Sequence, residues 1–441
     1  MDRSRVWTPS DGNGQNVSSP ISNYKQIRSN RSLLVFFFFL FFGMFSINRA
    51  RLHFGAIVSF VLLFHPRTRN SRKLGNYSFK IAADNIGTIR PLEKACHFNK
   101  IYQLGDSIAD TGNLVRESPF GSGYPFAHLP YGESTFGFPT GRCSDGLLMI
   151  DYIALAAGLP YLEPSMKEDG NFTTGVNFAV GGSTALPKEV LEAKDITNPI
   201  SNSSLSVQLD WMSSHFASIC HTKEVCRKML EKSLFFVGEI GGNDYNVPFL
   251  EGRSMNELTA LVPEVVQSIT NAIKRVIDFG ATRIIVPGNF PIGCIPVYVA
   301  CFQTNDTAAY DEHHCLKDLN NFAEIHNQLL KASIKKLKKD YPKVVIVYGD
   351  YYNAYLSLLS NARSLGFDEN ALQKACCGTE PYDCSGGKLC GTPGVKACPR
   401  PDKYISWDGV HSTQQAYKYM TAHLLDSIMP QLKCHSSAQD A

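Results

Sequence analysis

The sequence predicts an α/β fold in which a central parallel β-sheet carries helices on both faces. Two observations indicate this: short apolar runs alternate with amphipathic segments from Cys96 onward, and several polar segments directly follow apolar runs. Of the 441 residues, 44% are hydrophobic and 19% are charged, which is typical of a globular protein. Because ligands bind at the carboxyl ends of parallel strands, we expect the functional site to lie there.

Five short apolar runs are the predicted strands of this sheet. Helical segments separate them, as expected for strands joined by crossover helices. The runs are Ile101–Leu104, Val176–Val180, Leu234–Ile240, Arg283–Val286 and Val344–Tyr348.

The clearest helix is predicted to begin at Ser254. Ser254 and Glu257 have the spacing of a capping box, in which each side chain satisfies a backbone N–H at the start of the helix. The apolar residues that follow keep i, i+3, i+4 spacing, and Gly280 is placed to end the helix.

Two further helices are predicted towards the C-terminus. One covers about Leu316–Leu337 and stops before Pro342, since proline is excluded from a helix interior. The last begins at Thr413, and Ser412 and Gln415 are its predicted capping pair.

Charge is unevenly distributed along the chain. Residues 1–75 contain 11 Lys and Arg against 2 Asp and Glu, whereas the remaining residues contain 32 basic against 38 acidic side chains. A mildly acidic body is a poor binder of polyanions, because nucleic-acid affinity depends on neutralising phosphates. The composition therefore argues against a nucleic-acid partner.

Residues 1–75 are predicted to be an N-terminal extension and targeting region. Their two apolar runs, Leu33–Ile47 and Phe54–Phe64, are each shorter than the ~18–20 apolar residues that a membrane span needs. The second run has the shape of a signal peptide that begins at Met44, which makes 1–43 an upstream extension. The alternative is a signal anchor that uses both runs. We expect no stable membrane span in the mature protein.

Thirteen cysteines, all from Cys96 onward, indicate an oxidising compartment. No Cys-x-x-Cys pair occurs, so zinc-ribbon and thioredoxin-type motifs are excluded. Five cysteines fall in a Gly/Pro-rich stretch at 370–400, which we predict to be a disulfide-linked excursion from a single domain over 96–433. An odd number leaves one thiol unpaired within the chain, and Cys434 is the candidate.

Several Asn-x-Ser/Thr triplets also fit a secretory route. We expect a secreted protein, extracellular or vacuolar, and a monomer. The candidate glycosylation sites are Asn76, Asn171, Asn202 and Asn305, and a further triplet starts at Asn30.

The first segment that could take part in catalysis is Gly105-Asp106-Ser107, directly after a predicted strand. A serine in a tight, glycine-preceded turn at a strand end presents its hydroxyl to the site. Taken alone, Gly-Asp-Ser is equally an ordinary turn. No Gly-x-Ser-x-Gly occurs, which excludes the α/β-hydrolase type of nucleophile turn.

A second segment places Asp408 and His411 three residues apart, immediately before the last helix. A carboxylate at this spacing can accept from imidazole Nδ1–H and leave Nε2 free to take a serine proton. Alone, the pair is also a common helix-start feature. With an exposed Ser107 it forms a candidate catalytic triad.

Two glycine-containing segments supply donors for an oxyanion. Gly181-Gly182 and Gly241-Gly242-Asn243 each follow a predicted strand, and offer backbone N–H groups and a side-chain NH₂. The plain alternative for each is a strand-to-helix turn.

These four segments, in this order, resemble the signature of the plant GDSL esterase/lipase family within the SGNH hydrolases. The resemblance covers about Cys96 to Leu432 and is greatest to the branch that contains sinapine esterase and acetylajmalan esterase. It includes three further blocks, at 139–146, 286–294 and 350–354. The family implies a three-layer α/β/α flavodoxin-like fold and no cofactor.

The resemblance also implies a role for each site residue. Ser107 would be the nucleophile and first oxyanion donor, and Gly182 and Asn243 the other donors. His411 would be the base and Asp408 its orienting acid. No His-Glu-x-x-His motif is present, and this chemistry needs no metal.

The predicted function is therefore hydrolysis of a carboxylic ester, with an acetyl, hydroxycinnamoyl or lipid acyl ester as substrate. One alternative is an acyltransferase, which would use the same catalytic residues. Two others are a non-catalytic binding protein and a disulfide-rich wall protein, and both would leave the candidate triad and oxyanion donors unexplained. Loops Glu117–Phe138 and Pro187–Ser206 are expected to shape the substrate site. Their aromatic residues either stack on an aromatic acyl group or pack the loop onto the body; they are Phe120, Tyr124, Phe126, Tyr131, Phe136 and Phe138.

Overall fold

A computed structural model describes residues 89, 91–117, 121–382 and 386–434. The predicted targeting region 1–75, Asn30, Asn76 and Phe120 lie outside the described residues. Within the part described, no helix is both long and apolar enough to cross a membrane. The domain limits 96–433 stay a prediction.

The described residues form a five-stranded, all-parallel sheet with the strand order β2-β1-β3-β4-β5. This order has its switch point between β1 and β3, where ligands bind in flavodoxin-like folds. The prediction of a central parallel sheet is confirmed. The strands are β1 (Lys100–Leu104), β2 (Gly175–Asn177), β3 (Ser233–Val237), β4 (Arg283–Pro287) and β5 (Val345–Gly349).

Two strands end earlier than the apolar pattern predicted. β2 ends at Asn177, although Phe178 N–H and Val180 N–H still donate to the backbone carbonyls of Gln103 and Gly105 in the segment that follows. β3 stops at Val237, before the positive φ of Gly238 (109°) takes the chain out of the ladder. In both places the apolar run continues into buried loop, so hydrophobicity does not mark the end of the strand.

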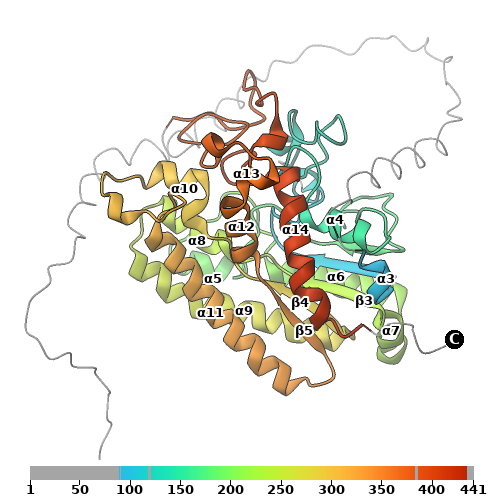
Figure 1. The fold of residues 1–441 in the computed structure, drawn as a ribbon. Coiled ribbons are helices and arrows are strands. Elements are labelled where there is room, and N and C mark those ends of the chain that lie inside the picture. The colour runs from blue at the N-terminus through green and yellow to red at the C-terminus, as the bar shows by residue number, and fades with distance from the viewer. Residues whose placement is uncertain (1–88, 90, 118–120, 383–385, 435–441) are drawn as a thin grey trace, which may run out of the picture. The chain divides into compact units, whose positions relative to one another are not determined.

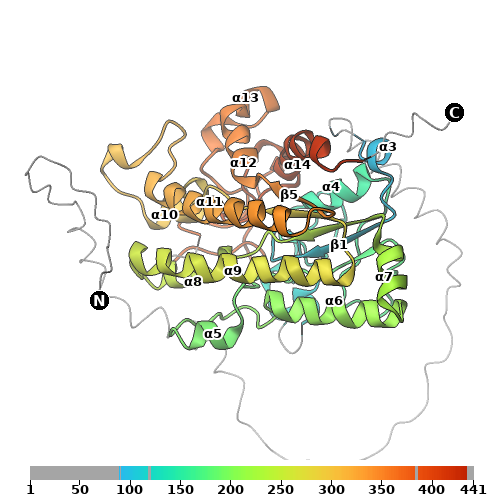
Figure 2. The ribbon, with the colours of Figure 1, turned by 90° about the horizontal axis from the view of Figure 1, so that it is seen from below.

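Helices cover both faces of the sheet, so the predicted three-layer arrangement is confirmed. α6 and α9 lie on one side of the sheet and α4, α12 and α14 on the other (Figures 1 and 2). α11 packs against α9 and β5. The helices are α3 (Glu93–Cys96), α4 (Met149–Ala156), α5 (Lys188–Glu192), α6 (Leu205–Ile219), α7 (Lys223–Leu230), α8 (Gly242–Leu250), α9 (Met255–Phe279), α10 (Pro296–Cys301), α11 (Lys317–Asp340), α12 (Tyr351–Ser360), α13 (Ala362–Leu365) and α14 (Gln414–Ile428).

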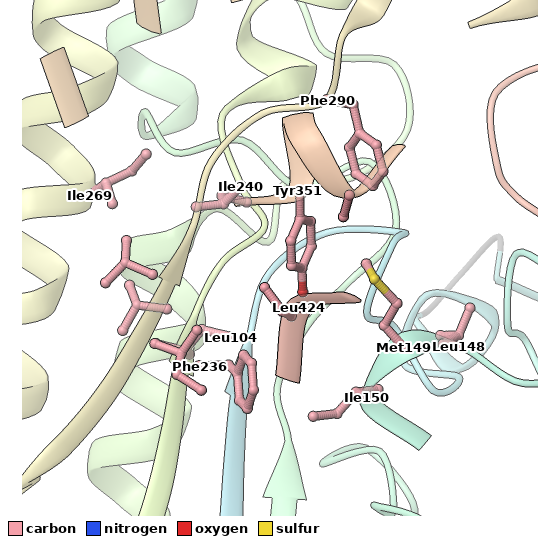
Figure 3. Packing of buried hydrophobic residues seen from close by; sticks show 14 of the residues in the cluster. Leu104, Leu148, Met149, Ile150, Phe236, Ile240, Ile269, Phe290, Tyr351 and Leu424 are labelled. Carbon is pink, nitrogen blue, oxygen red and sulfur yellow. The ribbon is translucent and has the colours of Figure 1, made fainter. Parts of the chain in front are cut away.

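The apolar core fills the space on both sides of the strands. Every residue of β3 is buried, as expected for a parallel strand covered on two faces. Figure 3 shows Leu104 and Phe236 from the strands in one packed group with Leu424 of α14. Ile269 of α9 belongs to the same cluster of buried residues. This core holds the carboxyl ends of β1 and β3 in fixed register.

The predicted cap of α9 is confirmed, whereas that of α14 is not. Ser254 and Glu257 form the predicted capping box of α9, and Gly280 ends it in a left-handed conformation. The predicted Ser412/Gln415 pair is wrong by one residue: Thr413 is the N-cap of α14, and its side chain accepts from Ala416 N–H. Several polar residues in succession left the register of this cap ambiguous.

The disulfides correct the prediction for Cys434. It pairs with Cys96, because the end of α14 returns beside the segment that precedes β1 (Cα–Cα 4.8 Å). Among the described cysteines the free thiol is the buried Cys143. The excursion at 370–400 contains the expected internal framework; its described bonds are Cys376–Cys398 and Cys377–Cys390. The other described disulfides are Cys220–Cys226 and Cys294–Cys315.

Candidate active site

Ser107 lies in a tight turn at the carboxyl end of β1. Asp106 organises the turn, since its carboxylate accepts from Ile108 N–H and its carbonyl accepts from Ala109 and Asp110. Gly105 is required by close packing: a Cβ there would lie 2.9 Å from the carbonyl oxygen of Glu239. The turn therefore leaves the half-buried Ser107 hydroxyl at the switch point of the sheet.

The loop between Trp407 and α14 brings Asp408 and His411 to this serine. Ser107 Oγ lies 2.8 Å from His411 Nε2, and His411 Nδ1 lies 2.7 Å from Asp408 Oδ2. When Nδ1–H donates to the carboxylate, Nε2 carries no proton and accepts from the serine hydroxyl. Asp408 and His411 are both buried. The structure thus brings together the three residues that the sequence predicted as a triad.

The cysteine-rich excursion supports the loop that carries Asp408 and His411. Cys377 N–H donates to Trp407 O at 2.7 Å, and Cys376 N–H donates to Ser406 O at 3.1 Å. The Trp407 ring is buried among Cys376, Cys377 and Cys390. The disulfides therefore position the loop, although they lie far from Ser107 in the sequence.

Replacing Cys377 and Cys390 together with serine is expected to lower kcat as well as stability. Losing a bond across 13 residues costs about 3 kcal/mol of unfolding free energy in the chain-entropy model. The matched control replaces Cys220 and Cys226, whose bond spans 6 residues between α6 and α7 and costs about 2 kcal/mol. We expect the control to keep wild-type kcat at a temperature where both variants are folded, as checked by circular dichroism. Equal kcat in both variants would contradict this role for the excursion.

The backbone around Gly182 is fixed by Asp110. The Asp110 carboxylate accepts from the N–H groups of Gly112, Asn113 and Leu114 after Ser107, and from Gly181 N–H after β2. One side chain therefore joins the turns at the ends of two neighbouring strands. Within the described part of the chain, neither Ser107 N–H nor Gly182 N–H donates a hydrogen bond. Both remain available to a substrate oxygen.

Asn243 lies in the first turn of α8, shortly after β3, and contacts the turns that follow β1 and β2. Its Nδ2 donates to Ser183 O at 2.9 Å and, over a longer 3.3 Å, to Asp106 Oδ2. The adjacent Asp244 anchors α8, since its carboxylate accepts from Ala185 and Leu186 N–H. The structure thus places all three predicted donor residues around the Ser107 turn.

Buried carboxyl groups control the electrostatics of the site. Burial lowers the pKa of His411, but the Asp408 carboxylate, its hydrogen bond and the Asp106 charge together raise it above the ordinary value. Burial raises the pKa of Asp408, and the His411 charge and hydrogen bonds outweigh this and lower it. Asp408 is therefore an anion at neutral pH. Burial and the neighbouring Asp106 charge raise the pKa of Glu239, so this carboxyl stays protonated and donates to Asp106.

The predicted substrate loops meet at the site. Tyr124 OH donates to Ile200 O, which joins the two loops, and the Phe126 ring lies edge-on to the His411 ring at 5.9 Å. Phe136 and the exposed Phe138 line a cavity of about 510 Å³, which also contacts Thr111 and Arg116. Tyr131, by contrast, is buried. Of the predicted aromatic residues, Tyr131 therefore packs into the protein, whereas Phe136 and Phe138 line the cavity.

Other predicted or possible sites are separate from this array. Asn171, Asn202 and Asn305 are exposed, and their glycosylation stays a prediction. Cys294, Asp311 and Cys315 lie within ligand distance of one another, but the two cysteines form a disulfide and offer no thiolate to a metal.

Sequence reasoning missed the roles of three residues that organise the site. Asp110 was present in the Ser107 segment, and an aspartate two residues before Gly-Asn is a signal for a carboxylate that accepts backbone N–H groups. Gln208 pairs with both the N–H and the carbonyl of Gly105, but it reaches across from α6 and has no local signal. Tyr131 donates to Asp408, which only the fold reveals.

A serine hydroxyl on a buried His–Asp pair, beside free backbone N–H donors, is the arrangement of a serine hydrolase. The comparisons with known proteins agree. A model of the family described as GDSL-like Lipase/Acylhydrolase matches residues 101–424. The chain belongs to this family, and it is a carboxylic ester hydrolase.

The chain is similar to curated plant enzymes over most of its length. It is 42% identical to Acetylajmalan esterase 1 of Rauvolfia serpentina over 344 residues, 78% of this chain and 90% of that one. It is 44% identical to GDSL esterase/lipase At1g28570 of Arabidopsis thaliana over 336 residues, 76% of this chain and 86% of the relative. Among solved structures, a phospholipase A1 from Streptomyces albidoflavus NA297 matches with a TM-score of 0.31 and 14% identity, covering 75% and 99% of the two chains, which supports no further conclusion. The predicted resemblance to plant GDSL esterases is confirmed.

Proposed function

We propose that this chain is a secreted serine esterase that cleaves its substrate through an acyl-enzyme on Ser107. The observation that carries the proposal is the continuous contact from Ser107 Oγ to His411 Nε2 (2.8 Å) and from His411 Nδ1 to Asp408 Oδ2 (2.7 Å). These distances allow proton transfer from the serine to the imidazole without movement of the backbone.

In the first step, His411 Nε2 takes the Ser107 proton while Oγ attacks the ester carbonyl carbon. The Asp408 carboxylate stabilises the imidazolium that forms and holds its Nδ1–H. The tetrahedral intermediate then collapses, His411 returns the proton to the leaving alcohol, and the acyl group stays on Ser107. Water repeats the sequence and releases the acid.

The oxyanion of each tetrahedral intermediate is held by Ser107 N–H, Gly182 N–H and Asn243 Nδ2. The two backbone donors have no competing acceptor in the described residues, and the long contact of Asn243 to Asp106 is the one a substrate oxygen would replace. A single donor of this kind is commonly worth about 3–4 kcal/mol of transition-state stabilisation.

The substrate class proposed is an ester of a short acyl group or of an aromatic acyl group. A named relative is an acetylajmalan esterase, which supports an acetyl ester. Phe126 beside His411 supports an aromatic group near the reacting carbonyl. A secretory route is supported by the disulfides, which persist in oxidising compartments.

The proposal is tested with a panel of acetyl, hydroxycinnamoyl and long-chain acyl esters incubated with the purified protein. Products are identified with and without an added acceptor alcohol. We expect free acid to form from at least one short or aromatic ester in water alone. Turnover that appears only with the acceptor would indicate an acyltransferase, and cleavage restricted to long-chain esters would contradict the substrate class.

The pH dependence follows from the environment of His411. Only the neutral imidazole can accept the serine proton, so activity is lost as the pH falls through the pKa of His411. Burial lowers that pKa, and Asp408 and Asp106 together raise it above 6.5. The midpoint of the acid limb of kcat/KM is therefore expected above pH 6.5. An unperturbed histidine, with a pKa of roughly 6.5, would place this midpoint near pH 6.5. A limb at or below 6.5 would show that burial outweighs the two carboxylates.

A further inference from the structure

Tyr131 contacts the acidic member of the proposed triad directly. Its hydroxyl donates to Asp408 Oδ2 at 2.8 Å, and this is the same oxygen that accepts His411 Nδ1–H at 2.7 Å. Tyr131 comes from the loop that precedes α4, far from Asp408 in the sequence. Two donors from distant segments thus meet on one carboxylate oxygen.

The four hydrogen bonds to Asp408 divide between its two oxygens. Oδ1 accepts from the backbone N–H groups of Val410 and His411, at 3.0 and 2.7 Å. Oδ2 accepts from Tyr131 and the His411 ring. A carboxylate offers about four acceptor positions, so this one is filled. Among the described residues, Tyr131 is the side chain besides His411 that fixes the direction of Oδ2.

Packing holds the Tyr131 phenol in place. The side chain is 2% exposed, and its ring meets the edges of Phe126 at 5.3 Å and Trp407 at 5.9 Å. Phe126 also contacts the His411 ring, and Trp407 directly precedes Asp408. The aromatic cluster therefore leaves the hydroxyl little freedom to find another partner.

The simplest alternative is that Tyr131 merely satisfies its own buried hydroxyl. Other buried tyrosines of this protein do not share this contact. Among the described residues, the hydroxyls of Tyr102 and Tyr355 are buried and have no protein hydrogen-bond partner. A carboxylate acceptor is therefore not common to the buried tyrosines, so the Asp408 contact calls for its own explanation.

We propose that Tyr131 is a positioning residue of the ester-cleaving reaction, which orients Asp408 Oδ2 towards His411 and moderates the basicity of the imidazole. This inference rests on the proposed function. An O–H donor on Oδ2 draws electron density from that oxygen and weakens its bond to the imidazolium. Without the donor, the imidazolium would be more stable and His411 would hold its proton to a higher pH.

The other ionisable groups near the pair are the Asp106 carboxyl, the Cys143 thiol and the Tyr417 phenol. Burial and the Asp408 charge raise the pKa values of Cys143 and Tyr417, so both stay neutral in the working range. Burial and Asp408 also raise the pKa of Tyr131, which keeps its hydroxyl a donor. The charges that act on His411 are then those of Asp408 and of Asp106, whose own pKa burial raises to about 7. Tyr131→Phe removes neither carboxyl group.

The test compares Tyr131→Phe with Tyr355→Phe as a matched control. Each variant loses one buried hydroxyl and keeps its ring, and Tyr355 lies on α12 outside the proposed triad. Two readouts are taken: the pH profiles of kcat and kcat/KM, and the NMR titration of ¹³C-labelled His411, assigned with His411→Gln. The NMR titration reports the imidazole in the absence of any substrate.

We expect Tyr131→Phe to lower kcat about 10-fold, the usual weight of a hydrogen bond to a charged group, and to leave KM unchanged. Its acid limb and its His411 titration should both move to higher pH, whereas Tyr355→Phe should match wild type in all respects. Unchanged titration of His411 in Tyr131→Phe would overturn the inference, even if stability falls. Absence of ester turnover in the wild-type protein would refute the proposed function instead, and the NMR arm would still report whether Tyr131 acts on His411.

Discussion

Ser107→Ala is expected to lower kcat by about 10⁴-fold or more, because in the described residues Ser107 Oγ is the hydroxyl that contacts His411 Nε2. Without it, only binding and oxyanion stabilisation remain. Folding should be unaffected, since Ser107 is half-buried and its Oγ bonds only to His411 in the described residues. The measurements are ester turnover and covalent labelling by a fluorophosphonate probe. Both should be lost.

The control for this prediction is Ser122→Ala. Ser122 lines the neighbouring cavity and takes no part in the proposed triad. This variant should keep wild-type labelling. If Ser107→Ala protein is still labelled by the probe, then the nucleophile is a different residue and the proposed mechanism is wrong.

Asp408→Asn is expected to lower kcat by about 10⁴-fold while preserving the shape of the side chain. The single amide oxygen would be retained by the backbone N–H groups of Val410 and His411, which now bond to Oδ1. The NH₂ group would then face His411 Nδ1, which must become an acceptor. The ring proton moves to Nε2, and His411 can no longer accept from Ser107.

Asp402→Asn is the matched control for this substitution. Asp402 lies in the preceding turn, pairs with Arg400 at 2.7 Å and is exposed to solvent. We expect its kcat to remain within about twofold of wild type, because an exposed ion pair of this kind contributes little. Retention of a tenth or more of wild-type kcat by Asp408→Asn would contradict the orienting role of Asp408.

The sequence predicted the fold and the triad because their signals are local. Strand-length apolar runs, the Ser254–Glu257 capping box and the Asp408–His411 spacing each depend on neighbouring residues. Three of the polar segments directly follow predicted strands, which predicted that they meet, since the carboxyl ends of parallel strands share one edge of the sheet. Asp408 and His411 precede the last helix instead, and the resemblance to the GDSL family joined them to Ser107. The roles of the site residues still await the substitutions above.

Contacts between distant segments were not predictable in this way. Gln208 reaches Gly105 from α6, and Tyr131 reaches Asp408 from a loop whose aromatic residues had two plausible uses. The free thiol was assigned to Cys434 because it lies near the tail, but cysteine pairing depends on which Cα atoms the fold brings within reach. Strand ends were also missed, because buried loops in this fold are as apolar as the strands.

The Cys96–Cys434 bond has a consequence for how the chain matures. It closes a covalent ring across a separation of 338 residues, so it can form only after the whole of that ring has been synthesised. Once formed, it keeps both parts of the chain attached if a protease cuts a surface loop between them, so a nicked molecule can retain Ser107 and His411 together.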